Sequence, residues 1–299
     1  MTVRVAPAVL TVAAAAWLVA GAAGTGAQDA CQPVGAVRAS AEPLRAEQPA
    51  RELLLVPGTV ARPGVASPTR APWLNTNGAR FMRKPDAKYR YELPEGKGAL
   101  GAAEAVAYGA DAVLQVAPAD LPPVCRVFAF TRDVPPLQLP PVADIGVVDD
   151  GSPVVAEVMN LLVRRNLLFQ IVAAPQSTLP VNVKLGTPEY PVAEAADPSG
   201  FALKIRRQLT DDRRRLRLFG SEVVIARMTG DGSRVRIQLL NYGNRDIAGL
   251  RVRVRGTYRT GAAYVLDQER VALADYVAAD GATEFSLPLL TTYAVVDLR

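Results

Sequence analysis

The chain has 299 residues and no histidine, and its 34 basic and 29 acidic side chains give a net charge of +5. The lack of histidine excludes Ser-His-Asp and Cys-His nucleophilic sites, imidazole bases and nearly all zinc enzymes. Any chemistry would depend on carboxylate, tyrosine, lysine or arginine side chains, and we expect neither a cofactor nor a metal site.

Residues 1–27 have the features of an export signal. Arg4 gives a positive start, an uncharged apolar run follows, and Thr25-Gly26-Ala27 is a small-residue cleavage site. We therefore expect a secreted or periplasmic protein whose mature chain begins near Gln28. An uncleaved anchor helix and a lipoprotein cleaved before Cys31 are the alternatives. After signal removal we expect no membrane span, because charges or prolines interrupt every later apolar run.

The basic balance is mild and spread along the chain, so we expect no nucleic acid partner for an exported protein. Cys31 and Cys125 are the only cysteines. They would be able to pair in an oxidising compartment. The interpretation favoured here leaves Cys31 on a loose tail and makes Cys125 a small buried apolar residue. The sequence leaves the oligomeric state open.

In chain order, residues 28–50 are rich in Ala, Pro, Gln and Glu and are typical of a flexible leader. Residues 52–56 predict a first strand, and the proline-broken segment 61–97 predicts a long loop. The pattern that follows predicts a helix at 98–108 with Gly109 as its C-cap, a strand at 112–116 and a helix at 118–131.

The clearest unit follows the proline-rich segment 133–142, which we interpret as a sub-boundary or stiff linker. A buried strand at 145–148 leads to the turn Asp149-Asp150-Gly151, and Ser152-Pro153 is a strong helix start. The helix and a second strand at 167–172 complete a β-α-β unit, which predicts a parallel sheet. A further strand is predicted at 181–185 and a further helix after Asp197-Pro198.

From about residue 216 the apolar pattern takes a period of two. We expect four side chains to point inward and the alternating arginines to face water; the four are Val252, Val254, Phe285 and Leu287. Short alternating strands separated by turn signals predict an antiparallel sandwich. The predicted fold class is α/β plus all-β: a Rossmann-like or flavodoxin-like α/β domain at 51–215, then a small antiparallel β-sandwich at 216–299.

This layout resembles the last two domains of β-galactosidase-type glycoside hydrolases, a glutamine-amidotransferase-like domain followed by a terminal sandwich. The resemblance covers residues 142–299 and includes the closing segment 285–298, which is similar to the last strands of such sandwiches. The catalytic barrel is missing, because residues 51–135 are too few for eight β-α units. Asp149-Asp150-Gly151 stands where an amidotransferase would carry its nucleophilic cysteine. The resemblance therefore implies accessory domains with no catalytic residue.

Two groups of polar residues are candidate ligand sites. One loop combines an indole, two amides and a guanidinium, which suit sugar recognition, in Trp73, Asn75, Asn77 and Arg80. The alternative is an Asx-rich loop pinned by a buried tryptophan. Asp149 and Asp150 follow a strand at the end where α/β sheets bind ligands. Acids at that position also satisfy a helix N-terminus, which is the interpretation we favour.

A glycosidase would need two carboxylates flanking the scissile bond. The acids near the loop are Glu92, Glu95, Glu104 and Asp111. Glu104, on an alanine-rich helix, is interpreted as solvated. The arginine-rich run around Asp211-Asp212 is interpreted as a solvated helix end with local ion pairs.

The sequence thus favours an exported, non-catalytic two-domain protein that binds carbohydrate or another envelope protein. A carboxylate-dependent glycoside hydrolase-like enzyme is one alternative. Structural association through the edge of the sandwich is the other.

Overall fold

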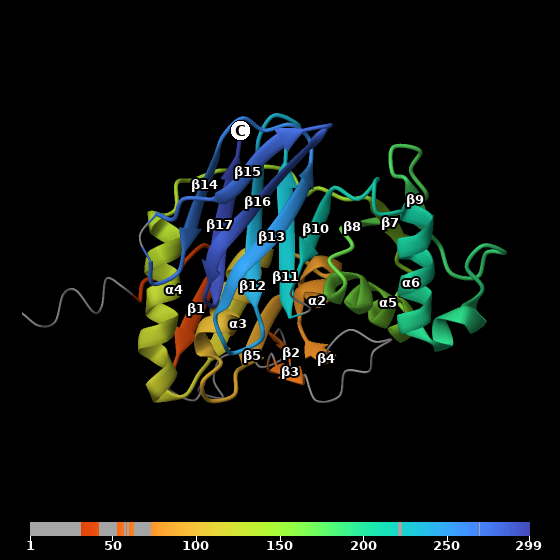
Figure 1. Ribbon diagram of the computed structural model, residues 1–299. Coiled ribbons are helices and arrows are strands. Elements are labelled where there is room, and N and C mark those ends of the chain that lie inside the picture. Colours follow the sequence, from red (N-terminus) through yellow and green to blue (C-terminus); the bar gives the residue numbers. More distant parts are fainter. Residues whose placement is uncertain are drawn as a thin grey trace, which may run out of the picture.

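The computed structural model describes residues 31–41, 53–56, 58, 60–62, 73–220, 223–268 and 270–299. The predicted export signal at 1–27, and residues 28–30 and 42–50 of the predicted leader, lie outside them. Within the described residues no helix combines the length and apolar character needed to cross a membrane. An α/β region is followed by a region of antiparallel strands (Figure 1).

The α/β region has short strands and helices in the order β1 (Val37–Ser40), β2 (Leu53–Val56), β3 (Val60–Arg62), β4 (Trp73–Asn75), α2 (Gly78–Arg83), β5 (Lys88–Glu92), α3 (Gly98–Tyr108), β6 (Asp111–Gln115) and α4 (Leu121–Asp133). After the proline-rich segment come β7 (Ile145–Val148), α5 (Pro153–Arg164), β8 (Phe169–Val172), β9 (Val181–Val183) and α6 (Pro198–Leu209). Short 3-10 helices at Pro118–Asp120 and Val192–Ala196 precede α4 and α6.

The first sheet is parallel and has the order β1-β6-β5-β2. Its strand β1 lies in the segment predicted to be a flexible leader, so that prediction is wrong for residues 31–41. A disulfide joins Cys31 to Cys125 of α4, so the favoured interpretation of two unpaired cysteines is also wrong. Because the bond uses the Cys31 sulfur, that atom is not available to carry a lipid.

The segment 61–97 is not one long loop, because it contains β4, α2 and β5. Phe81 of α2 is buried and packs edge-on against Tyr89 of β5, with 4.9 Å between the ring centroids. These elements have three to six residues each, too few to produce a readable apolar period. Tertiary packing therefore creates them more than local preference does.

The second sheet is also parallel, with the order β8-β7-β9. Its β7-α5-β8 unit confirms the prediction, and the Ser152 hydroxyl accepts a hydrogen bond from the Val155 N–H at 3.2 Å. The α/β class is thus confirmed. The described parallel strands are divided between two sheets, however, instead of forming the single flavodoxin-like sheet predicted for 51–215.

The β region contains β10 (Leu216–Phe219), β11 (Val224–Gly230), β12 (Val235–Asn241), β13 (Ile247–Arg255), β14 (Gly261–Val265), β15 (Ala274–Ala279), β16 (Ala282–Leu290) and β17 (Tyr293–Leu298). They form two antiparallel sheets, β10-β13-β16-β15 and β11-β12-β17-β14. The inward prediction is confirmed, since four side chains are at most 1% exposed and share one core with the other sheet: Val252, Val254, Phe285 and Leu287.

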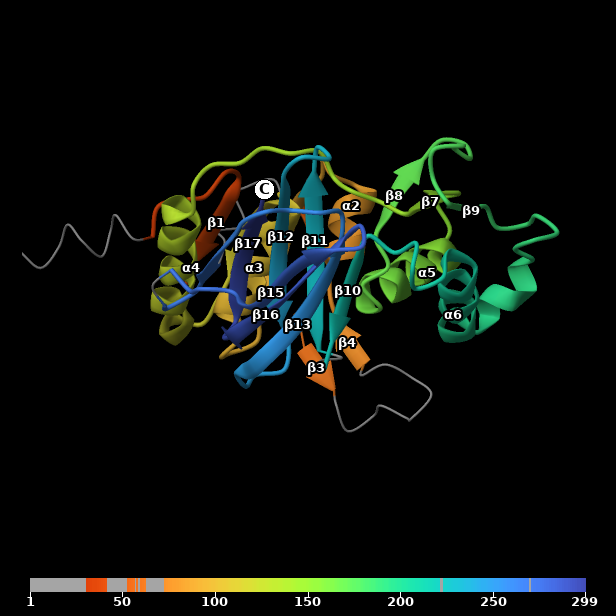
Figure 2. The same cartoon turned by 45° about the horizontal axis from the view of Figure 1, so that its top comes forward.

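The outer face of the sheet β11-β12-β17-β14 is covered by α3 and α4 (Figures 1 and 2). Tyr293 of β17 contacts Phe130 of α4, with ring centroids 5.5 Å apart. The expectation that strand arginines face water is therefore wrong for this sheet. Arg236 pairs with Asp297 at 2.8 Å, and Arg227 donates to the Ala107 carbonyl at the end of α3. An alternating pattern shows which face is apolar in one sheet but not what covers the other face.

Candidate functional site

A cleft of about 440 Å³ lies between β2, which ends the first sheet, and helices α2 and α5. Leu54 and Leu55 of β2 border it and are 40% and 60% exposed. Pro153 and Ala156 of α5 form the facing apolar border. A cleft edged by exposed apolar side chains is the usual form of a small-molecule site.

The polar lining of the cleft is mostly cationic. Arg80 and Arg83 of α2 and the following Lys84 line it, whereas Glu157 of α5 is the one carboxylate among the lining residues. Among the described residues neither Arg80 nor Lys84 forms an ion pair with a carboxylate, although the Lys84 charge contributes to lowering the pKa of Asp149. The cleft therefore presents two cationic side chains that are available to an anion.

Asp149 and Asp150 satisfy neighbouring groups of the protein. The Arg83 guanidinium donates two hydrogen bonds of 2.7 Å to the Asp149 carboxylate, and the Gly151 N–H donates a third. The hydrogen bonds from Arg83 hold the pKa of Asp149 below its usual range, and those from Ser152 lower the pKa of Asp150. Both acids thus accept hydrogen bonds in the turn before α5, and Asp149 also pairs with Arg83 of α2. The described residues contain no group of three or more acids, cysteines or histidines that would hold a metal ion.

Asp149→Asn is expected to lower the free energy of unfolding by about 1–2 kcal/mol at pH 7, the scale of a charge-assisted hydrogen-bonded pair. Because the native pKa is depressed, this stabilisation is present above the unfolded pKa and is lost as pH falls through the native value. Urea denaturation between pH 7 and about pH 2.5 should show that the free energies of unfolding of wild type and Asp149→Asn approach each other as the pH falls. The exposed Asp86→Asn is the control. A loss of stability in Asp149→Asn that stayed constant with pH would contradict the pairing of Asp149 with Arg83.

Glu104 is fully buried in a network of hydrogen-bond donors, so its interpretation as a solvated residue is wrong. The Thr76 hydroxyl donates to Oε1 at 2.5 Å, the Asn77 N–H at 2.9 Å and the Tyr242 hydroxyl at 2.6 Å. The Tyr91 hydroxyl donates to Oε2. Burial and the Glu104 charge raise the pKa of Tyr242 well above its usual value. Thr76 lines the cleft, so this network lies directly behind the cleft wall.

The tyrosines of this network were not anticipated from the sequence. Tyr91 is on β5 and Tyr242 follows β12, more than a hundred residues beyond Glu104. No local spacing signals such a meeting, because the contact depends on α3 packing against β12.

The predicted sugar-binding loop is only partly brought to the cleft. Arg80 lines it, whereas Asn77 is buried and Asn75 donates from Nδ2 to the Gly58 carbonyl at 2.5 Å. Trp73 belongs to β4, and its side chain lies outside the described part of the structure.

The other predicted acids are not arranged as a glycosidase pair. Glu92 is exposed and forms a 2.6 Å ion pair with Arg90, and Glu95 is exposed in the following turn. In the β5–β6 register Asp111 is opposite Lys88, four residues from Glu92. That places Glu92 and Asp111 roughly 13 Å apart along the strands, beyond the separation of either glycosidase class.

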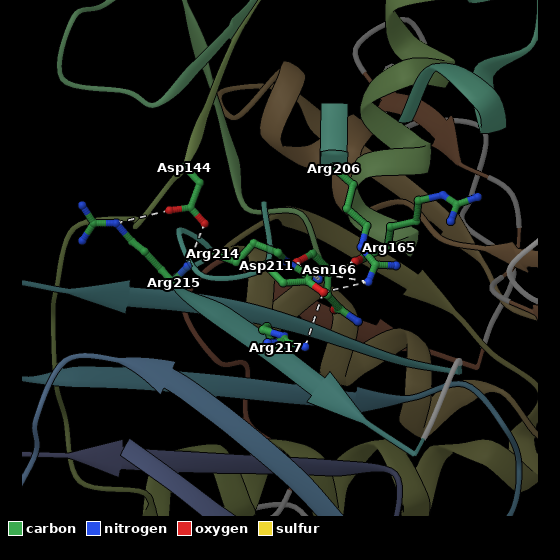
Figure 3. A network of polar contacts seen from close by, with 8 residues as sticks. All are labelled: Asp144, Arg165, Asn166, Arg206, Asp211, Arg214, Arg215 and Arg217. Atoms are coloured by element: carbon green, nitrogen blue, oxygen red, sulfur yellow. Dashed lines mark hydrogen bonds and ion pairs between the residues drawn. The ribbon is translucent and has the colours of Figure 1, made fainter. Parts of the chain in front are cut away.

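A second polar cluster joins α5, α6 and β10 (Figure 3). Asp211 forms ion pairs of 3.2 to 3.4 Å with three arginines, Arg206, Arg214 and Arg217. Arg214 is buried and donates to the Arg165 and Asn166 carbonyls at the end of α5. Local ion pairs were predicted here and are confirmed. They tie three elements together, so this cluster has a structural role.

Asp144 is also part of this cluster, and burial raises its pKa. It accepts a 3.0 Å hydrogen bond from the Arg215 N–H and lies 3.4 Å from the Arg215 side chain (Figure 3).

No family model matches the chain, and no curated protein matches it. Among solved structures it is similar to α-L-fucosidase isoenzyme 2 from Paenibacillus thiaminolyticus, with a TM-score of 0.56 and 9% identity over 74% of this chain and 62% of that one. The fold is similar to that of this fucosidase. At this identity the likeness shows the fold alone.

Two weaker matches are the β-galactosidase from Rahnella sp. R3 and a GH30 endoxylanase from Clostridium papyrosolvens C71. The first has a TM-score of 0.40 and 10% identity over 73% of this chain and 56% of that chain. The second has a TM-score of 0.21 and 13% identity over 74% of this chain and 59% of that chain. The chain therefore spans less than two thirds of each of these three proteins.

Proposed function

We propose that this chain is an exported, non-catalytic protein that binds an acidic saccharide in the cleft between β2, α2 and α5. The cationic lining of the cleft carries the proposal, because Arg80 and Lys84 form no ion pair with a carboxylate among the described residues. Guanidinium and ammonium groups bind carboxylates such as those of uronic acids.

Other lining groups suit the uncharged parts of a sugar. Thr76 and Asn160 provide hydroxyl and amide groups for sugar hydroxyls. Leu54 and Leu55 offer an apolar border for the carbon face of a ring. The cleft thus combines charge, hydrogen bonding and apolar contact in one place.

The lining of the cleft argues against a glycoside hydrolase. Hydrolysis needs two carboxylates on either side of the bond, and Glu157 alone lines the cleft. Glu104 lies behind Thr76 with its oxygens engaged by buried donors. The fold likeness to the fucosidase does not distinguish an enzyme from an accessory protein, and we propose the accessory role on the lining of the cleft.

Two observations bear on the other parts of this proposal. The disulfide between Cys31 and Cys125 supports export, because such bonds persist in oxidising compartments. The exposed end strand β15 has a register irregularity between Ala274 and Val277, and Asp275 has a positive φ of 51°. Irregularities and charges at a sheet edge disfavour pairing with a strand of another chain, so they count against association through this edge.

Calorimetric titration with trigalacturonate and with a neutral galactose trisaccharide tests the function. We expect the acidic trisaccharide to bind and Arg80→Gln to weaken it by about tenfold, the scale of one charged hydrogen bond. Arg259→Gln removes the same charge from an exposed position outside the cleft and should have no effect. The bound trisaccharide should remain uncleaved.

Equal binding of the two trisaccharides, or equal binding by wild type and Arg80→Gln, would overturn the acidic-saccharide assignment. Turnover that Glu157→Gln abolishes would favour the hydrolase instead.

A further inference from the structure

A second cavity, of about 260 Å³, lies between α2, the turn from α5 to β8, and β11. Its wall is mainly apolar and includes Phe81, Met82, Val163, Leu167 and Phe169. The cavity does not share a lining residue with the cationic cleft, and all of its lining residues are described.

Arg227 of β11 supplies the charge in this cavity. Its Nη1 donates to the Ala107 carbonyl, and its guanidinium carbon lies 5.3 Å from the centre of the Tyr108 ring. No carboxylate among the described residues pairs with it. Arg236, on the neighbouring strand, is by contrast neutralised by Asp297 at 2.8 Å.

The remaining polar groups of the cavity do not supply a counter-charge. The Asn166 amide bonds to the backbone of β11, accepting from the Ala226 N–H at 2.7 Å and donating to the Val224 carbonyl at 2.8 Å. Arg227 is partly buried, and this burial lowers its pKa. A guanidinium has five N–H donors in a planar fork that matches a carboxylate. A partly desolvated cation without an acid partner has a free-energy cost, and a bound anion would offset that cost.

We propose that this cavity binds a small monocarboxylic acid with an apolar tail. The carboxylate pairs with the Arg227 guanidinium, and the tail packs against the wall formed by Phe81, Met82 and Phe169. The volume of about 260 Å³ lies just below the usual range of about 300–1,000 Å³ for ligand sites, which suits a short alkyl chain and not an oligosaccharide. This site is independent of the proposed saccharide cleft.

Titration calorimetry with three probes separates the contribution of the carboxylate from that of the alkyl tail. Octanoate has the carboxylate and the tail, octanol has the tail without the charge, and acetate has the charge without the tail. We expect octanoate to bind at least about tenfold more tightly than octanol, since a charge-assisted pair is lost, and acetate to give no measurable heat. Similar affinities for octanoate and octanol would overturn the proposal.

Two variants test the location. Arg227→Gln should weaken octanoate by about tenfold or more, with Arg259→Gln as the charge-matched control. Met82→Phe keeps Arg227 and fills the cavity, so it should also weaken octanoate while circular dichroism stays native. The Met82→Phe variant still tests the site if Arg227→Gln does not fold. Octanoate binding that is unchanged by Met82→Phe would refute the site, and Arg80→Gln should leave octanoate binding intact.

Discussion

Replacing Glu104 with alanine is expected to lower the free energy of unfolding by about 4–6 kcal/mol. The variant would leave the hydroxyls of Thr76, Tyr91 and Tyr242 and the Asn77 N–H without their shared acceptor. Each buried donor left unsatisfied costs about 1–3 kcal/mol, and relaxation or an entering water recovers part of the total. The measurement is the urea midpoint at a constant m-value.

Glu104→Gln is the matched control for this effect. Its amide oxygen can accept from Thr76, Asn77 and Tyr242, while its NH₂ group donates to the Tyr91 hydroxyl oxygen after that hydroxyl turns. We expect a loss of only about 1 kcal/mol, because most hydrogen bonds are kept. If alanine were as well tolerated as glutamine, the network would not hold the carboxylate as described.

The network also bears on the proposed non-catalytic role of the cleft. A general acid or base must lie within reach of the proton it transfers. Glu104 is fully buried, and Thr76 lies between it and the cleft. Its carboxylate accepts a hydrogen bond from the Tyr242 hydroxyl and so links the α/β region to the β region.

Elements with strong local signals were predictable. Helix α3 runs from Gly98 to Tyr108 and ends at Gly109 in the left-handed conformation, as the sequence suggests. The Ser152 cap and the turn before it fix the β-α-β unit. The alternation of Val252 and Val254 with arginines identified the inward face of β13. Each of these signals lies within one element.

Features that depend on distant partners were missed. Strand β1 has no readable period and exists through its pairing with β6, more than seventy residues away. Glu104 was interpreted as solvated because an alanine-rich helix has no distinct polar face, yet nearly all of α3 is buried between two layers. Arg83, which lines the cleft, pairs with Asp149, 66 residues away. Such contacts follow from the packing of layers, which a single sequence does not encode locally.

Removing the disulfide between Cys31 and Cys125 is expected to destabilise the protein by about 4–5 kcal/mol. The bond closes a loop of 94 residues, and the entropy of closing a loop of that length corresponds to about 4.7 kcal/mol. The disulfide also holds the segment that leads into β1. The same segment is held by a hydrogen bond of 2.8 Å from the Arg132 side chain to the Gln32 carbonyl. The effect should therefore combine a less constrained unfolded chain with a looser β1.

Urea denaturation of wild type with and without dithiothreitol, and of a Cys31→Ser, Cys125→Ser double variant, measures this effect. Reductant should lower the midpoint of the wild type to that of the double variant and leave the double variant unchanged. A wild type insensitive to reductant, with no free thiol released, would contradict the pairing. The amide protons of β1 should exchange faster in the double variant than those of the central strand β5, because β1 ends the sheet and loses its covalent tie.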